Sequence, residues 1–246
     1  MTASAPAPTG RILAAQTVME LRLTLRRGES LLLTFAIPLL LLVFFKAADI
    51  EGAGIDFLVP GILALAVMST AFTGLAIATG FERGYGVLVR LGTTPLTRAH
   101  LLAAKTAGVV AVEVLQAVLI AGVGYALGWR LHGNAGAALL LLVVGTAAFA
   151  GLGLLMAGTL RAEATLAGAN GIYLVLLLLG GVVFPLTRLP GWLQGVANVF
   201  PTAALSHGMR TALHSGGGLD GSDLLVLAAW AVGALLLASR TFRWAP

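Results

Sequence analysis

The sequence predicts an all-α integral membrane protein that crosses the bilayer six times. Hydrophobic residues make up 59% of its 246 residues and charged residues only 10%, and the mean hydropathy is +0.98. Soluble domains carry about 25% charged residues, so this chain has too few charges to cover a water-soluble globule. Its apolar residues are also gathered into long blocks, as transmembrane helices require.

Six apolar blocks are the predicted transmembrane helices. Four of them exceed the roughly 20 residues that cross a 30 Å hydrocarbon layer. The first and last blocks are shorter, and they span only with help from flanking residues or from local thinning of the bilayer. The blocks cover residues 31–45, 57–81, 99–128, 135–160, 164–187 and 224–239.

The basic residues predict the orientation of these spans. With a cytoplasmic N-terminus, eleven of the 15 lysines and arginines fall inside, as expected when cationic loops resist translocation. Only Lys46, Arg130, Arg188 and Arg210 fall outside. We therefore expect a multi-pass protein of the cytoplasmic (inner) membrane with both termini inside. The net charge of +5 does not indicate a nucleic-acid partner, because the basic residues form no single patch.

The N-terminal region divides into two parts ahead of the first span. Residues 1–10 are rich in Ala, Pro, Ser and Thr, do not look like a signal peptide, and predict a disordered tail. Residues 11–28 predict an interfacial helix, with Thr9 as a possible cap and Gly28 as a stop. Its Arg22, Arg26 and Arg27 suit anionic headgroups. Residues 11–246 are expected to form one transmembrane domain.

Two connections between spans are irregular. The inside loop 80–98 contains a short helical apolar face and ends at a turn signal before Pro95. A helix so short can serve as a docking element or simply connect two spans. The outside segment 185–215 is apolar but interrupted by prolines, so it has no run long enough to span. It predicts a pair of re-entrant or interfacial helices, with Trp192 at the membrane interface.

Motifs for enzymatic chemistry are missing from the sequence. Neither lysine, Lys46 or Lys105, follows a glycine as in a phosphate-binding G-x-x-x-x-G-K-S/T loop. The four histidines lack the His-Glu-x-x-His spacing, there is no cysteine, and no G-x-S-x-G elbow occurs. We expect no enzyme activity, no metal site and no cofactor in this chain.

Polar residues inside the predicted spans have two possible roles. Glu113 lies near the centre of the third block, Gln116 lies one helical turn later, and Asn170 lies in the fifth block. Ionisable groups at membrane depth usually line a pathway or a packed interface. The alternative is that these groups only hydrogen-bond one helix to another. The sequence leaves both interpretations open.

The two irregular connections together carry a family resemblance. "ERGYGVLVRLGTTPLTRAHLLAAK" and "FPLTRLPGWLQGVANVFPTAALSHGMR" resemble the segments after the second and fifth spans of ABC type-2 exporter permeases, especially the daunorubicin-resistance group. One departure is "LLGGVVFP", where many relatives have a Ser-Gly pair before the proline. The matching positions are Glu82, Gly86, Arg90, Leu91, Pro95 and Lys105, and then Pro185, Pro190, Trp192, Leu193, Pro201 and Arg210.

The resemblance implies the permease subunit of an ATP-driven exporter. ATP and Mg would be bound by a separate ATPase, present in two copies, that docks on a cytoplasmic coupling helix in loop 80–98. The path would lie between this chain and a second permease, expected to be identical, within membrane lipid. The implied coupling residues are Glu82, Arg83, Gly86, Arg90, Leu91 and Pro95, and the implied outside gate contains Pro185, Pro190, Trp192, Pro201 and Arg210.

The cargo and the energy source are less constrained. The low aromatic content of 7% offers few stacking surfaces for a sugar chain, which favours a hydrophobic small molecule, such as a drug or antibiotic, or a lipid. An ion-coupled secondary transporter that uses Glu113 is the alternative, and a non-transporting membrane anchor is a third possibility.

Overall fold

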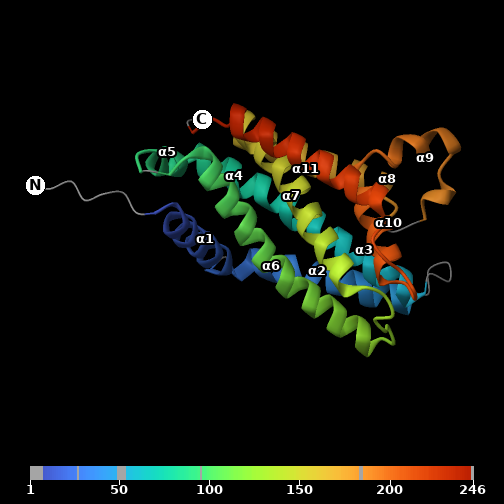
Figure 1. Ribbon diagram of the computed structural model, residues 1–246. Helices are drawn as coiled ribbons and strands as arrows, with labels where there is room; N and C mark the ends of the chain where they lie inside the picture. Colours follow the sequence, from blue (N-terminus) through green and yellow to red (C-terminus); the bar gives the residue numbers. More distant parts are fainter. Residues whose placement is uncertain (1–7, 27, 49–53, 95, 183–184, 245–246) are drawn as a thin grey trace, which may run out of the picture.

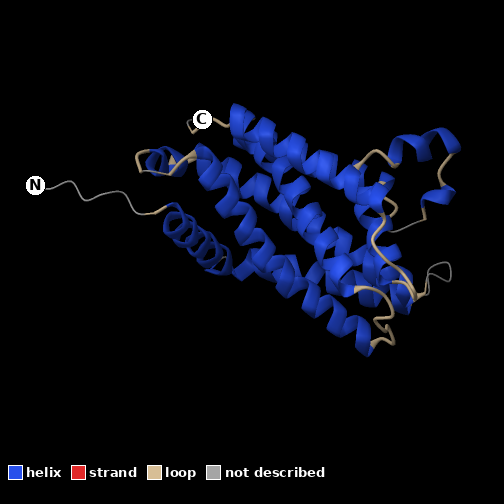
Figure 2. Cartoon of the chain, in the orientation of Figure 1, coloured by secondary structure: helices blue, strands red, loops and turns tan. Residues whose placement is uncertain are grey.

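The computed structural model describes residues 8–26, 28–48, 54–94, 96–182 and 185–244. Over these ranges the chain folds into helices and loops, without a β-strand (Figures 1 and 2). This confirms the predicted all-α class. Residues 1–7 of the predicted tail lie outside the described residues.

Five helical stretches in the described ranges are long and apolar enough to cross a membrane. The second helix of the bundle, α2 (Gly28–Ala47), has a shorter described apolar part, Thr34–Ala47, so the sixth span stays a prediction. The five are α3 (Ile55–Val67) continued by η2 (Met68–Gly74) and α4 (Leu75–Gly84), then α6 (Arg98–Ala126), α7 (Ala135–Thr159), α8 (Ala162–Leu179) and α11 (Gly221–Thr241).

Shorter helices lie at the two ends of this bundle. Helix α1 (Thr9–Arg26) precedes α2, and α5 (Val87–Gly92) lies inside the loop that joins α4 to α6. The segment before α11 contains η3 (Leu186–Arg188), α9 (Gly191–Ala197) and α10 (Pro201–Leu213). Pro201 opens α10, where its missing N–H costs no helical hydrogen bond.

Helix α7 is the centre of the packing and contacts α11, α4, α10 and η2. Glycines allow this close approach, as is common between membrane helices. A Cβ atom on Gly151 would lie 2.9 Å from Cβ of Ala234 on α11, and one on Gly153 would lie 2.7 Å from the carbonyl oxygen of Phe72 in η2. Helices α11 and η2 therefore pack closely against α7, each at a glycine of α7.

The π-helical stretch η2 interrupts the second span. Such stretches insert an extra residue per turn and often occur at functional sites. Here η2 turns Ser69, Thr70 and Thr73 toward a cavity rather than into the α7 contact. The local helix geometry therefore supplies hydroxyl groups to a wall that is otherwise apolar.

The bundle has two distinct ends (Figure 1). At one, which we call the α5 end, lie α1, α5 and the last turn of α11. At the other, the α9 end, lie α9, α10 and the loop that joins α6 to α7. A backbone hydrogen bond of 2.7 Å from Asn134 to the carbonyl oxygen of Ala212 ties that loop to α10.

Candidate functional site

A cavity of about 740 Å³ lies among α1, α2, α3, η2, α4, α6 and α8. Its volume falls within the range of sites that hold small molecules. Most of its wall is apolar, and hydroxyl and carboxamide groups interrupt it at a few positions. The apolar lining includes Leu23, Ile37, Pro38, Leu65, Leu75, Ile77, Phe81, Val109 and Val112, and the polar lining includes Thr34, Ser69, Thr70, Thr73 and Asn170.

Behind this wall, Gln116 of α6 forms hydrogen bonds with α2 and η2. Its Nε2 donates to the carbonyl oxygen of Thr34 on α2 at 2.8 Å, and its Oε1 accepts from the Thr70 hydroxyl at 3.1 Å. The side chain is buried and does not line the cavity itself. The Thr73 hydroxyl, by contrast, is buried without a partner and lines the cavity, so it is available to a ligand.

A charged cluster borders the cavity near the α5 end. Lys105 on α6 has a side chain only 1% exposed, and its Nζ lies 2.9 Å from Glu20 of α1 and 2.6 Å from Glu82 of α4. A buried cation requires such partners, because an unpaired one is expensive in a low-dielectric interior. We call these three residues the Lys105 node. The node joins three helices, and all three of its side chains line the cavity.

Sequence reasoning placed Glu82 and Lys105 on one motif but missed Glu20. Glu20 is the only acidic residue of α1, on a helix otherwise rich in arginine. A single carboxylate on an arginine-rich helix is the sequence feature that could have identified Glu20 as a functional residue. Gln16, one turn earlier, donates to Glu20 at 2.8 Å and helps to orient its carboxylate.

The other predicted coupling residues differ in burial, and some are buried whereas others are exposed. Arg83 is buried, and its Nη2 donates to the carbonyl oxygen of Leu160 at 2.5 Å, at the end of α7. Gly86 adopts a left-handed φ of 72° that turns the chain from α4 into α5, a conformation that favours glycine. Arg90 is exposed and Leu91 is partly buried, whereas Pro95 lies outside the described residues.

Glu113 faces away from the cavity. Its carboxylate accepts a hydrogen bond from the Thr146 hydroxyl on α7, and the side chain is buried between the two helices. Asn170 is exposed at the cavity, where its Nδ2 donates to the Leu166 carbonyl oxygen of its own helix at 2.9 Å. The geometry therefore separates the two residues, with Glu113 in helix packing and Asn170 on the cavity wall.

Arg210 links the elements of the α9 end. Its Nη2 donates to the carbonyl oxygen of Val182 at 2.9 Å, and its guanidinium lies 3.7 Å from the centroid of the Phe57 ring on α3. Burial lowers the pKa of Arg210 to about 10, so the group stays charged at neutral pH. Of the other predicted gate residues, Pro201 is buried, Pro185 partly buried, and Pro190 and Trp192 are exposed.

Comparison with known protein families shows the family to which this chain belongs. The sequence model described as "ABC-2 type transporter" matches residues 13–214, which is most of the chain. This chain belongs to the ABC-2 type transporter family. It is therefore a multi-pass transmembrane component of the permease type and not the ATPase.

Two curated relatives of this ABC-2 permease show how far the similarity extends. It is 28% identical over 216 residues to the daunorubicin resistance ABC transporter permease protein DrrB1 of Streptomyces coeruleorubidus, covering 82% of this chain and 71% of that protein. It is also 28% identical over 196 residues to ABC transporter G family member 20 of Dictyostelium discoideum, covering 75% of this chain. The chain spans 26% of the length of that second relative.

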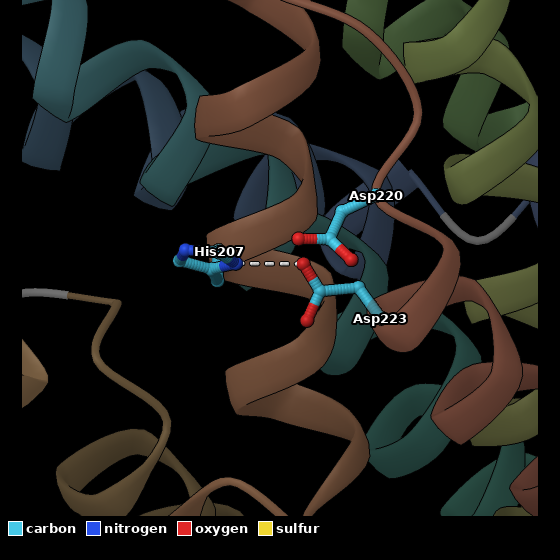
Figure 3. Close-up of side chains that lie close together, drawn as sticks. All are labelled: His207, Asp220 and Asp223. Atoms are coloured by element: carbon cyan, nitrogen blue, oxygen red, sulfur yellow. Dashed lines mark hydrogen bonds and ion pairs between the residues drawn. The ribbon is translucent and has the colours of Figure 1, made fainter.

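A separate polar cluster of the permease lies at the α9 end, where His207 meets Asp220 and Asp223 (Figure 3). Their nearest ligand atoms lie within 4.8 Å of one another, a spacing at which they could hold a metal ion. Each residue also has a structural partner. His207 Nδ1 lies 2.7 Å from Asp223, which pairs α10 with α11. Asp220 caps α11 by accepting from Ser222, and these hydrogen bonds lower the pKa of Asp220.

Proposed function

We propose that this ABC-2 permease is the membrane-spanning half of an ATP-driven exporter in the cytoplasmic membrane. Its cargo is a hydrophobic small molecule, such as a drug or antibiotic, or a lipid. The energy comes from a separate ATP-binding subunit in two copies, and a second identical permease completes the path. The single observation that carries this proposal is the apolar cavity bordered by the Lys105 node, which joins the helix ahead of α5 to the cavity wall.

The α5 end is the cytoplasmic end in this proposal. Among the described residues it holds most of the arginines, including those on α1 and in the α4–α6 connection, in agreement with the positive-inside rule. The α9 end then faces outward. Trp192, 74% exposed on α9, would anchor that end at the membrane surface.

The helix α5 is the proposed docking element. Tyr85 is 77% exposed, and Val87 and Val89 are exposed beside Arg90. Exposed apolar groups clustered at a water-facing end favour a protein partner. A force on α5 would reach α4 through the turn at Gly86 and then α6 and α1 through the Lys105 node.

The lining of the cavity supports the proposed cargo class. Aliphatic side chains and the aromatic rings of Phe81 and Tyr173 suit an apolar ligand, while Thr73 and Asn170 offer hydrogen bonds at fixed positions. The name of the relative DrrB1 refers to resistance to daunorubicin, which supports a drug as cargo. The ion-coupled alternative receives less support, because Glu113 packs against Thr146 rather than lining the cavity.

A transport assay with a matched pair of variants tests the proposal. The permease and its ATP-binding subunit are reconstituted in vesicles, and ATP-dependent movement of an amphipathic fluorescent dye is measured. Ala78→Trp places an indole in the cavity, whereas Ala111→Trp adds the same group to an exposed position on α6 outside it. We expect the first variant to lose transport and the second to retain it. Dye movement that needs a pH gradient instead of ATP would contradict the proposal.

The docking element has its own test. Replacing Glu82 and Arg90 with Ala together should leave membrane insertion intact while reducing transport and its coupling to ATP hydrolysis. The two single variants separate a loss of ATPase docking from a loss of stability. Arg90→Ala, which changes an exposed group, should weaken recovery of the ATPase with the permease at unchanged stability. Glu82→Ala should act through the Lys105 node and lower stability. Equal transport in the double variant and wild type, at equal expression, would remove the docking assignment.

A further inference from the structure

Residues 242–244, which follow α11, pack against the rest of the bundle. Phe242 is fully buried, and its ring packs edge-on against that of Trp244, with centroids 6.2 Å apart. Between them, the backbone N–H of Arg243 donates to the carbonyl oxygen of Gly158 at 3.1 Å. Three consecutive residues after α11 are therefore fixed by contacts with other parts of the bundle.

These residues contact two different helices, at glycines in both cases. A Cβ atom on Gly158 of α7 would lie 2.5 Å from the Phe242 ring, so only glycine leaves room for that ring. A Cβ atom on Gly92, the last residue of α5, would lie 3.4 Å from the Trp244 ring, with two further ring atoms at 3.6 Å. The segment Phe242–Trp244 thus bridges α7 and α5.

Helix α5 depends on such outside contacts. It has six residues, and a helix of that length is not stable by itself in water. It joins α4 through the left-handed Gly86, and within α5 only Leu88 is fully buried. Its outer face, with Val87, Val89 and Arg90, is exposed. Contact with Trp244 at its last residue therefore fixes the end of α5 that lies farthest from α4.

We propose that Phe242–Trp244 acts as a clasp that holds the coupling helix against α7 and α11. A displacement of α5 is then passed to these two helices as well as to α4, so that the whole bundle responds rather than one span. The inference rests on the proposed docking role of α5. In it Trp244 is a positioning residue, which acts on transport only through α5.

The first experiment compares two neighbouring substitutions in the reconstituted permease–ATPase complex. Trp244→Ala removes the contact with α5, and Thr241→Ala changes an exposed side chain at the last residue of α11, just before the segment. Recovery of the ATPase, the rate of ATP hydrolysis and dye transport are measured together. We expect Trp244→Ala to bind the ATPase normally and to move roughly two- to thirtyfold less dye per ATP, a size typical of residues that carry coupling between sites. Thr241→Ala should match wild type.

Two results would overturn parts of this scheme separately. Unchanged dye transport per ATP in Trp244→Ala, with the ATPase bound, would remove the clasp and leave the docking role of α5 intact. If the wild-type permease recovered no ATPase, the proposed function itself would fail before the clasp was tested.

The second experiment uses the natural absence of cysteine. Gly92→Cys and Trp244→Cys are combined, and the two thiols are joined with a short bifunctional reagent. The double variant should be impaired in coupling before treatment, and the covalent link should restore it because α5 and the clasp move together. Each single cysteine variant, treated in the same way, is the control. Loss of the remaining transport on cross-linking would show that α5 must separate from the clasp and would refute the inference.

Discussion

Both ends of the bundle have hydrogen bonds to carbonyl oxygens, and the α5 end adds a buried ion-pair cluster that joins three helices. At the α5 end, three helices meet in the Lys105 node through ion pairs between side chains. At the α9 end, side chains and backbone N–H groups bind carbonyl oxygens, as Arg210 binds Val182 and Asn134 binds Ala212. A lysine ammonium is a compact charge on a flexible stem and tolerates changes in direction. Hydrogen bonds to fixed carbonyl groups tolerate smaller changes in direction.

Packing sharpens the same contrast. At the α9 end, a Cβ atom on Gly133 would overlap the carbonyl oxygen of Ala212 in α10, and one on Gly180 would overlap the Thr202 side chain of α10, so both segments approach that helix closely. Large apolar side chains are exposed at both ends, among them Met19 and Val89 at the α5 end and Trp192 at the α9 end. We interpret the α5 end as the region that a partner can move and the α9 end as the region that resists opening.

The largest expected effect is at the Lys105 node. Lys105→Met removes the buried cation that Glu20 and Glu82, both partly buried, share, and breaking a buried ion pair in this way costs about 3–5 kcal/mol. The matched control is Lys46→Met, which removes an exposed lysine from the end of α2. Thermal unfolding in detergent measures both. A Lys105→Met protein as stable as the control would show that the node does not hold the α5 end together.

Loss of Arg210 should have the next largest effect. Arg210→Met removes the hydrogen bond to Val182 and the contact with the Phe57 ring, at a cost of about 1–3 kcal/mol. Because this contact joins α10 to α3, we also expect dye to leak from vesicles without ATP. Arg161→Met, at an exposed position, is the control. Leak-free vesicles with the Arg210 variant would weaken the view that the α9 end is the closed one.

Glu113 lies between the two ends of the bundle. We expect its substitution to have a smaller effect than substitution of Lys105 or Arg210. Glu113→Leu loses the hydrogen bond with Thr146, and such bonds between membrane helices contribute about 0.6 kcal/mol on average. Glu113→Gln keeps the shape and the hydrogen bond, so ATP-driven transport should survive it. Vesicle assays with ATP and with an imposed pH gradient measure both variants. Gradient-driven uptake that disappears in Glu113→Gln would instead favour the ion-coupled alternative.

The smallest effect is expected from the pair of His207 and Asp223. The His207 side chain is 60% exposed, and exposed ion pairs contribute about 0–1 kcal/mol. His207→Gln should therefore change the unfolding temperature little, with or without added zinc. A rise in that temperature on addition of zinc, present in wild type and absent in His207→Gln, would make the cluster a metal site and part of what fixes the α9 end.

The sequence by itself determined the membrane class, the order of the helices and the position of the irregular segments. Apolar blocks and prolines are local features, and in a bilayer each helix satisfies its own backbone hydrogen bonds. The blocks therefore located the five long helices of the described chain, and the interrupted stretch 185–215 located η3, α9 and α10.

Only the tertiary structure decided how those helices are rotated and which polar groups meet. Lys105 pairs with Glu20, 85 positions earlier, and Glu113 meets Thr146, 33 positions later, rather than the cavity. Trp244 reaches Gly92 across most of the chain. Hydropathy cannot distinguish these outcomes, because lipid and protein interior are equally apolar, so the face that a membrane helix turns inward depends on close packing of small residues and on partners distant in sequence.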